Sequence, residues 1–174
     1  MAKTSNLREF QESILLRLKE ATAKGSVVST SRLGVTVGSK KLLINLTDVS
    51  EVLPVPPIQT VPLTQSWFLG VANVRGNLYN ITDLAQFMEM PATTKSSGNR
   101  IVLINSQLIT QVALVIDSLV GLRSVEAMEK KTASRKKGAF LSKNSFVDND
   151  KNEWFELDID SLVKDKKFIQ PTVA

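Results

Sequence analysis

The sequence predicts a mainly β protein built from small barrels, with one amphipathic helix near its N-terminus. From residue 33 onward, short apolar segments recur in which apolar and polar side chains alternate, the pattern of half-buried strands. Four prolines, at positions 54, 56, 57 and 62, exclude a long helix from that stretch. Many short strands separated by turn residues are typical of small β-barrels.

Residues 5–24 are predicted to form the helix. Six apolar residues recur there at helical spacing: Leu7, Phe10, Ile14, Leu15, Leu18 and Ala21. The polar face mixes acidic and basic residues, which favours packing on protein over binding to a membrane surface. Docking on the rest of the chain and docking on a partner both stay open. The small, polar residues 25–32 are predicted to be a linker.

Three hairpins and two short helices are then expected. Leu33–Val37 pairs with Leu42–Leu46 around Gly38 and Ser39. A short strand at Leu78–Ile81 precedes a brief helix capped by Thr82. The remaining elements are a hairpin of Arg100–Ile104 with Ile109–Ile116, continued by Val120, Leu122 and Val125; an exposed basic loop at Met128–Gly138; a hairpin of Phe140–Val147 with Trp154–Leu157; and a terminal helical turn with Ile159, Leu162 and Val163.

The composition excludes much chemistry. The 174 residues contain neither cysteine nor histidine, so thiolate nucleophiles, disulfides and imidazole general bases are absent. The first ten residues lack an apolar core, and no apolar run approaches the roughly 20 residues that a membrane helix needs. We therefore expect a cytoplasmic protein that is not an enzyme, holds no metal or cofactor, and does not insert directly into a membrane.

Several motifs resemble functional sites only in part. Residues 34–40 lack the glycine spacing of a phosphate-binding loop and lie within a predicted hairpin. Asp148, Asp150 and Asn152 begin like a calcium loop, but its glycine and its final glutamate are missing, so a polar turn is favoured. An enzyme using Asp83 with Asp117 would require the two carboxylates to converge in a pocket, which the sequence does not establish.

A basic cluster raises the alternative of a nucleic-acid-binding barrel. The net charge is +5, and five cations lie between residues 130 and 137: Lys130, Lys131, Arg135, Lys136 and Lys137. Modules that bind single strands also need stacking aromatic side chains, and none lies between Met128 and Gly138. A solvated loop is therefore favoured, and no nucleic-acid partner is expected.

The most informative stretch runs from Trp67 to Leu84. Arg75 follows an apolar run and precedes Gly76, so it is expected at the mouth of a turn with its guanidinium accessible. An exposed arginine among packed apolar residues is a reasonable interface anchor. A structural arginine that binds loop carbonyls is the alternative.

This stretch resembles the signature of the CheW-like family of chemotaxis coupling proteins. The matching positions are Gly70, Val71, Asn73, Arg75, Gly76, Asp83 and Leu84; Leu46–Val52, Arg100–Ile104 and Ala113–Asp117 with Leu122 resemble neighbouring family elements. The resemblance covers about residues 33–165. It implies a domain at 33–170 with two intertwined, five-stranded, SH3-like barrels, preceded by the helix and linker at 1–32.

The resemblance also implies a function. The protein would be an adaptor in receptor arrays at the membrane, coupling the cytoplasmic tip of methyl-accepting chemoreceptors to the regulatory domain of a CheA-type histidine kinase. The positions implied for partner contact are Val49, Glu51, Gly70, Asn73, Arg75 and Ile101. Val49, Gly70 and Ile101 have core or turn roles as the alternative.

Two features depart from the plain coupling proteins. Asn80 stands where the family's strand has proline, and the chain carries the N-terminal helix. With the ending Leu157–Val163, this is similar to the branch of the family that serves type IV pilus chemosensory systems in twitching motility.

Overall fold

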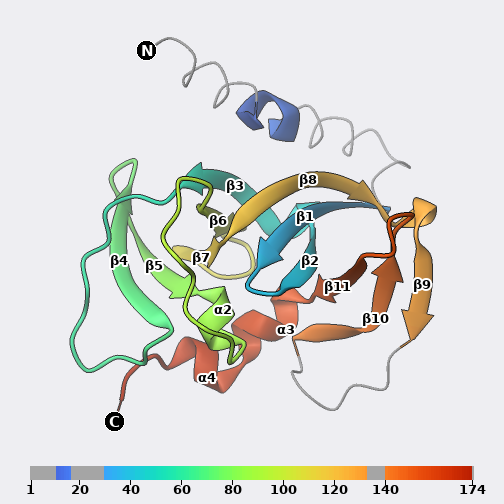
Figure 1. Cartoon of the computed structure of the whole chain (residues 1–174). Helices are drawn as coiled ribbons and strands as arrows, with labels where there is room; N and C mark the ends of the chain where they lie inside the picture. Colours follow the sequence, from blue (N-terminus) through green and yellow to red (C-terminus); the bar gives the residue numbers. More distant parts are fainter. Residues whose placement is uncertain (1–10, 17–29, 133–139, 174) are drawn as a thin grey trace.

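Two β-sheets make up most of the molecule, as predicted (Figure 1). The computed structural model describes residues 11–16, 30–132 and 140–173. One sheet has six strands in the order β8-β1-β2-β11-β10-β9, and the other has five in the order β3-β6-β7-β5-β4. The strands are β1 (Ser31–Val37), β2 (Lys40–Asn45), β3 (Val49–Pro54), β4 (Phe68–Val74), β5 (Asn77–Asp83), β6 (Arg100–Ile104), β7 (Val112–Ile116), β8 (Ser118–Ser124), β9 (Glu129–Thr132), β10 (Leu141–Val147) and β11 (Glu153–Leu157).

The chain passes between the sheets, so the two halves are intertwined. It leaves the six-stranded sheet after β2, builds the five-stranded sheet with β3 to β7, and returns with β8. The three predicted hairpins are confirmed as β1–β2, β6–β7 and β10–β11. The expected continuation of the second hairpin is wrong: Val120 and Leu122 lie in β8, which pairs with β1. Strand β7 already has β6 on one edge and β5 on the other, so neither edge can accept β8.

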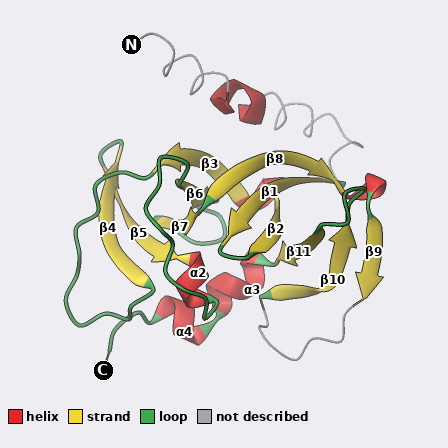
Figure 2. Cartoon of the chain, viewed as in Figure 1, coloured by secondary structure: helices red, strands yellow, loops and turns green. Residues whose placement is uncertain are grey.

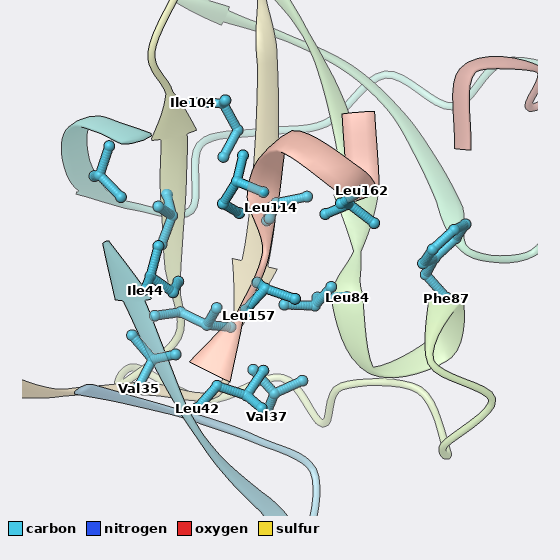
Figure 3. Close-up of a cluster of buried hydrophobic side chains, with 14 of the residues drawn as sticks. Val35, Val37, Leu42, Ile44, Leu84, Phe87, Ile104, Leu114, Leu157 and Leu162 are labelled. Atoms are coloured by element: carbon cyan, nitrogen blue, oxygen red, sulfur yellow. The ribbon is translucent and has the colours of Figure 1, made fainter. Parts of the chain in front are cut away.

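A shared core lies between the sheets (Figure 3). Leu42 and Ile44 of β2 point into it, together with Leu114 of β7 and Leu162 from a C-terminal helix, and all four are fully buried. Leu43, between the two β2 residues, points to the opposite side of its sheet, where it packs with Phe146 and Trp154. This alternation with a period of two residues follows from strand geometry.

The five-stranded sheet has a separate core on its far side. It contains Ala72, Val74, Ile81, Ile101, Leu103, Ala113 and Val115. Strand β7 supplies residues to both cores and is buried along its whole length, which explains its uninterrupted apolar sequence. Two sheets with their own cores and a common core agree with the expected pair of barrels. The first sheet has six strands instead of five because β9 adds an edge strand.

Three short helices gather beside the shared core (Figure 2). They are α2 (Leu84–Phe87), α3 (Ile159–Lys164) and α4 (Lys166–Ile169), and two 3-10 turns, η1 (Leu46–Asp48) and η2 (Val125–Ala127), link strands. Thr82 does not cap α2: it remains in β5, opposite Phe68. Asp83 is the cap, and its carboxylate accepts hydrogen bonds from the Ala85 and Thr93 backbone N–H groups and the Thr93 hydroxyl. A carboxylate that can accept all three bonds is the better cap at this position.

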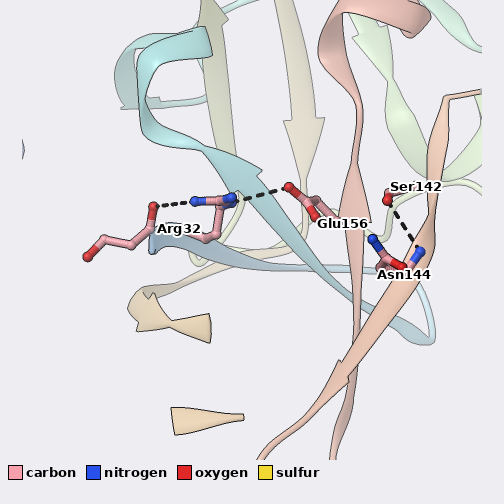
Figure 4. Close-up of polar contacts among 5 residues, drawn as sticks. Arg32, Ser142, Asn144 and Glu156 are labelled. Atoms are coloured by element: carbon pink, nitrogen blue, oxygen red, sulfur yellow. Dashed lines mark hydrogen bonds and ion pairs between the residues drawn. The ribbon is translucent and has the colours of Figure 1, made fainter. Parts of the chain in front are cut away.

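The predicted basic loop and linker also differ from the structure. Lys130 and Lys131 belong to β9, where they pair with Phe146 and Ser145 of β10. The other three cations of the basic cluster lie outside the described residues. The linker was expected to reach Arg32, but β1 begins at Ser31; Arg32 Nε lies 3.3 Å from Glu156 Oε1 of β11, an ion pair that ties two strands of the sheet (Figure 4). The N-terminal helix is helical at 11–16, and its other residues lie outside the described ranges.

Candidate partner-binding site

Arg75 and Gly76 form the two-residue turn between β4 and β5. Val74 pairs with Asn77 across it, and the φ angles of Arg75 and Gly76 are +51° and +85°. Positive φ at both central residues is the type I′ geometry that matches the twist of a hairpin. Asn73 stabilises the turn, because its Oδ1 accepts a hydrogen bond of 2.9 Å from the Gly76 N–H. Positive φ is costly for a residue with a side chain, so Arg75 occupies a strained backbone conformation at the first position of this turn.

Glu51 of β3 meets the Arg75 side chain. Nη1 of Arg75 donates to one carboxylate oxygen of Glu51 at 2.6 Å, and Nη2 donates to the other at 2.5 Å. Two parallel bonds of this kind fix both position and orientation. Strands β3 and β4 are the two edges of the five-stranded sheet, so the ion pair joins edges that are furthest apart in strand order. Closure of the sheet into a barrel creates the site.

The charged groups of Arg75 and Glu51 are accessible to solvent. The side chain of Arg75 is 63% exposed and that of Glu51 is 21% exposed. The hydrogen bonds with Glu51, followed by its Coulomb attraction, raise the pKa of Arg75 above its ordinary value. Exposed ion pairs contribute about 0–1 kcal/mol to stability. The pair is therefore a weak source of folding energy but a well-oriented donor group for a partner.

The N-terminal segment 11–16 reaches the same site. Oε1 of Glu12 lies 3.7 Å from Nη2 of Arg75. A cavity of about 270 Å³ beside the ion pair is lined by Glu12, Leu15, Leu16, Ser50, Glu51 and Arg75. Glu12 was not predicted as a site residue, although its position three residues before Leu15 places both on one helix face.

The six residues that the resemblance implied for contact divide into two groups. Glu51, Asn73 and Arg75 come together at the surface. Val49 and Ile101 are buried in the cores, and Gly70 is buried in β4 with a φ of +134°. The last three support the fold in this structure, and a contact role for them stays a prediction.

The two acids considered for an enzyme, Asp83 and Asp117, do not line the same cavity. Asp83 lines a second cavity, of about 560 Å³, and is the one carboxylate among its described lining residues. Asp117 instead accepts a hydrogen bond from the Gly38 N–H, so the two acids do not meet there. Within the described ranges, no three acidic side chains cluster in a way that could hold a metal ion. Searched over the same part of the chain, no helix has the length and apolarity to cross a bilayer.

Comparison with known proteins decides the family. The model of the CheW-like domain matches residues 32–167, most of the chain. The chain belongs to the CheW-like domain family. This confirms the resemblance, and the two intertwined sheets are those of a CheW-like domain.

Two relatives define the similarity further. PilI of Pseudomonas aeruginosa is 32% identical to this CheW-like protein over 98 residues, which are 56% of this chain and 54% of PilI. The match thus spans about half the length of that relative. The crystal structure of the scaffolding protein TtCheW from Thermoanaerobacter tengcongensis superposes with a TM-score of 0.62 at 17% identity, covering 74% of this chain and 88% of that one. The structural likeness supports the fold.

Proposed function

We propose that this CheW-like protein is a non-enzymatic adaptor that couples chemoreceptors to a CheA-type histidine kinase, in a type IV pilus chemosensory system. Membership of the CheW-like family supports the adaptor role, and the scaffolding role named for TtCheW agrees with it. Similarity to PilI supports the pilus system. We place the protein in the cytoplasm, beside membrane-bound receptor arrays, acting without a cofactor.

The Glu51–Arg75 pair is the observation that carries this proposal. A guanidinium held by two hydrogen bonds at the tip of a hairpin can recognise a polar group of a partner without further ordering. Asn73 holds the turn that presents it. We propose that Glu51, Asn73 and Arg75 form the contact surface and that Val49, Gly70 and Ile101 act by shaping the strands beneath it.

Charge reversal tests the assignment. In co-purification with a receptor tip fragment and with the kinase regulatory domain, Arg75→Glu is expected to weaken binding of at least one partner by about 1–3 kcal/mol, because it sets like charges together at an interface. The fold should persist, since the side chain is exposed and the ion pair is weak.

Lys164→Glu is the matched control. Lys164 is also an exposed cation, bound to Asp160 at 2.8 Å on α3, and lies outside the proposed surface. The Lys164→Glu variant should bind the receptor tip fragment and the kinase regulatory domain as tightly as the wild type does. Equal binding of both partners by wild type and a folded Arg75→Glu variant would reject the site, and failure of the wild type to bind either partner would reject the adaptor function.

A further inference from the structure

The described N-terminal segment lies on the proposed contact surface and resembles a bound peptide there. Glu12 adds a second carboxylate beside Arg75, at 3.7 Å, while Leu15 and Leu16 form the apolar wall of the cavity shared with Ser50 and Glu51. These contacts bring together residues from three separate parts of the sequence, at a site that already has its own ion pair.

The segment offers two kinds of contact from one helix face. Residues three and four apart are neighbours on a helix, so Glu12 projects beside Leu15 and Leu16. An arginine has five N–H donors, and Glu51 accepts from two of the nitrogens, which leaves capacity for a second acceptor. This surface therefore accommodates a helix face that carries a carboxylate followed by leucines one turn later.

We infer that residues 11–16 are an internal occupant of the Glu51–Arg75 surface, and that a partner helix with the same carboxylate-and-leucine face binds by displacing them. This inference rests on the proposed function, because it concerns the same surface. The internal contact is suited to exchange: Glu12 and Arg75 keep 41% and 63% of their side chains exposed, and Leu16 is 60% exposed. Such contacts hold the segment weakly, so a better-packed external helix replaces it.

A reversible tether tests the inference in the full chain. Because the protein contains no cysteine, Leu16→Cys with Ser50→Cys introduces one pair of thiols, both facing the same cavity. A short bis-methanethiosulfonate reagent links thiols that lie close together, and a reductant releases the link. The control pair is Ile14→Cys with Ser50→Cys, since Ile14 is two residues from Leu16, does not line the cavity, and points elsewhere on the helix.

The Leu16–Ser50 pair is expected to link within one chain faster than the control pair. The linked protein should bind the receptor tip fragment or the kinase regulatory domain at least tenfold more weakly than the reduced protein, and reduction should restore binding. An untethered variant gives an independent check: Glu12→Gln should bind the partner about two- to fivefold more tightly, the range for loss of one exposed ion pair.

Each other outcome overturns part of the inference. Linking no faster than in the control shows that the segment does not occupy the surface. Fast linking with equal partner binding before and after reduction shows that occupancy does not compete. If neither form binds a partner, the proposed function fails and the displacement fails with it, while the linking rates still decide whether the segment occupies the surface.

Discussion

Gly70 lies in β4 where another backbone segment crosses it, and its replacement by alanine separates two roles for this residue. A Cβ atom built on Gly70 would lie 2.0 Å from the Gln59 carbonyl oxygen and 2.7 Å from its carbon. The φ of +134° is itself a conformation that essentially glycine alone adopts. Gly70→Ala must therefore move the backbone at residues 59 and 60.

The loss of unfolding free energy in Gly70→Ala can be worked out from the hydrogen bonds of residue 59 and the φ angle of Gly70. Residue 59 is held to β4 by two backbone hydrogen bonds with Val71, of 2.8 and 2.9 Å. Losing both costs about 1–3 kcal/mol at about 0.5–1.5 each. The strained φ adds about 1–3 kcal/mol. Together, Gly70→Ala should lower the free energy of unfolding by about 2–6 kcal/mol.

Gly121→Ala is the matched control in a urea denaturation series. Its φ of +122° is similar, but a Cβ atom there meets nothing within 4 Å. The control should show the cost of φ alone, so the difference between the variants measures the backbone clash. Equal losses of stability would refute the reasoning. A Gly70→Ala variant of unchanged stability that no longer binds a partner would instead assign Gly70 to the interface.

Three further predictions concern the core, the acid side of the stability profile and the basic strand. Leu114→Ala should cost about 2–5 kcal/mol of unfolding free energy in urea, because it leaves a cavity in the shared core. The hydrogen bond from the Trp154 indole, with backbone bonds in the turn, lowers the pKa of Asp148 from 3.8 to about 2. The stabilisation that Asp148 contributes is therefore complete above about pH 4 and is lost as the pH falls through about 2. Asp148→Asn should lower the melting temperature at pH 7, and the melting temperature of the variant should fall less than that of the wild type between these two pH values. Parallel profiles for variant and wild type would contradict this. Lys130→Glu with Lys131→Glu should leave retention on single-stranded DNA unchanged across a salt series, whereas a salt-dependent loss would support the nucleic-acid alternative.

Composition alone decided which acid–base groups this protein contains. The absence of imidazole and thiol groups removed whole classes of mechanism before any contact was known. Similarly, the family signature around Arg75 led to the family that the domain comparison confirmed. The role of Arg75 at a turn was predicted because Arg75 and Gly76 close a local hairpin, whose geometry depends on neighbouring residues.

Long-range pairing was decided only by the tertiary structure. Alternation of side chains identified β8 as a strand, but it did not say that β7 had no free edge and that β8 must cross to β1. Composition likewise predicted that the segment around Lys130 is exposed, which it is, but missed its pairing as an edge strand.

The candidate site also combines features set by the local sequence with features set by the tertiary structure. The amino-acid sequence alone determined the hairpins, the exposed turn at Arg75 and the lack of imidazole chemistry. Each of these features depends on residue identity or on neighbours along the chain. The bidentate pair of Arg75 with Glu51, the approach of Glu12 and the burial of Val49 and Ile101 required the folded barrel. Residues 24 positions apart, on opposite edges of one sheet, meet only after the sheet has closed.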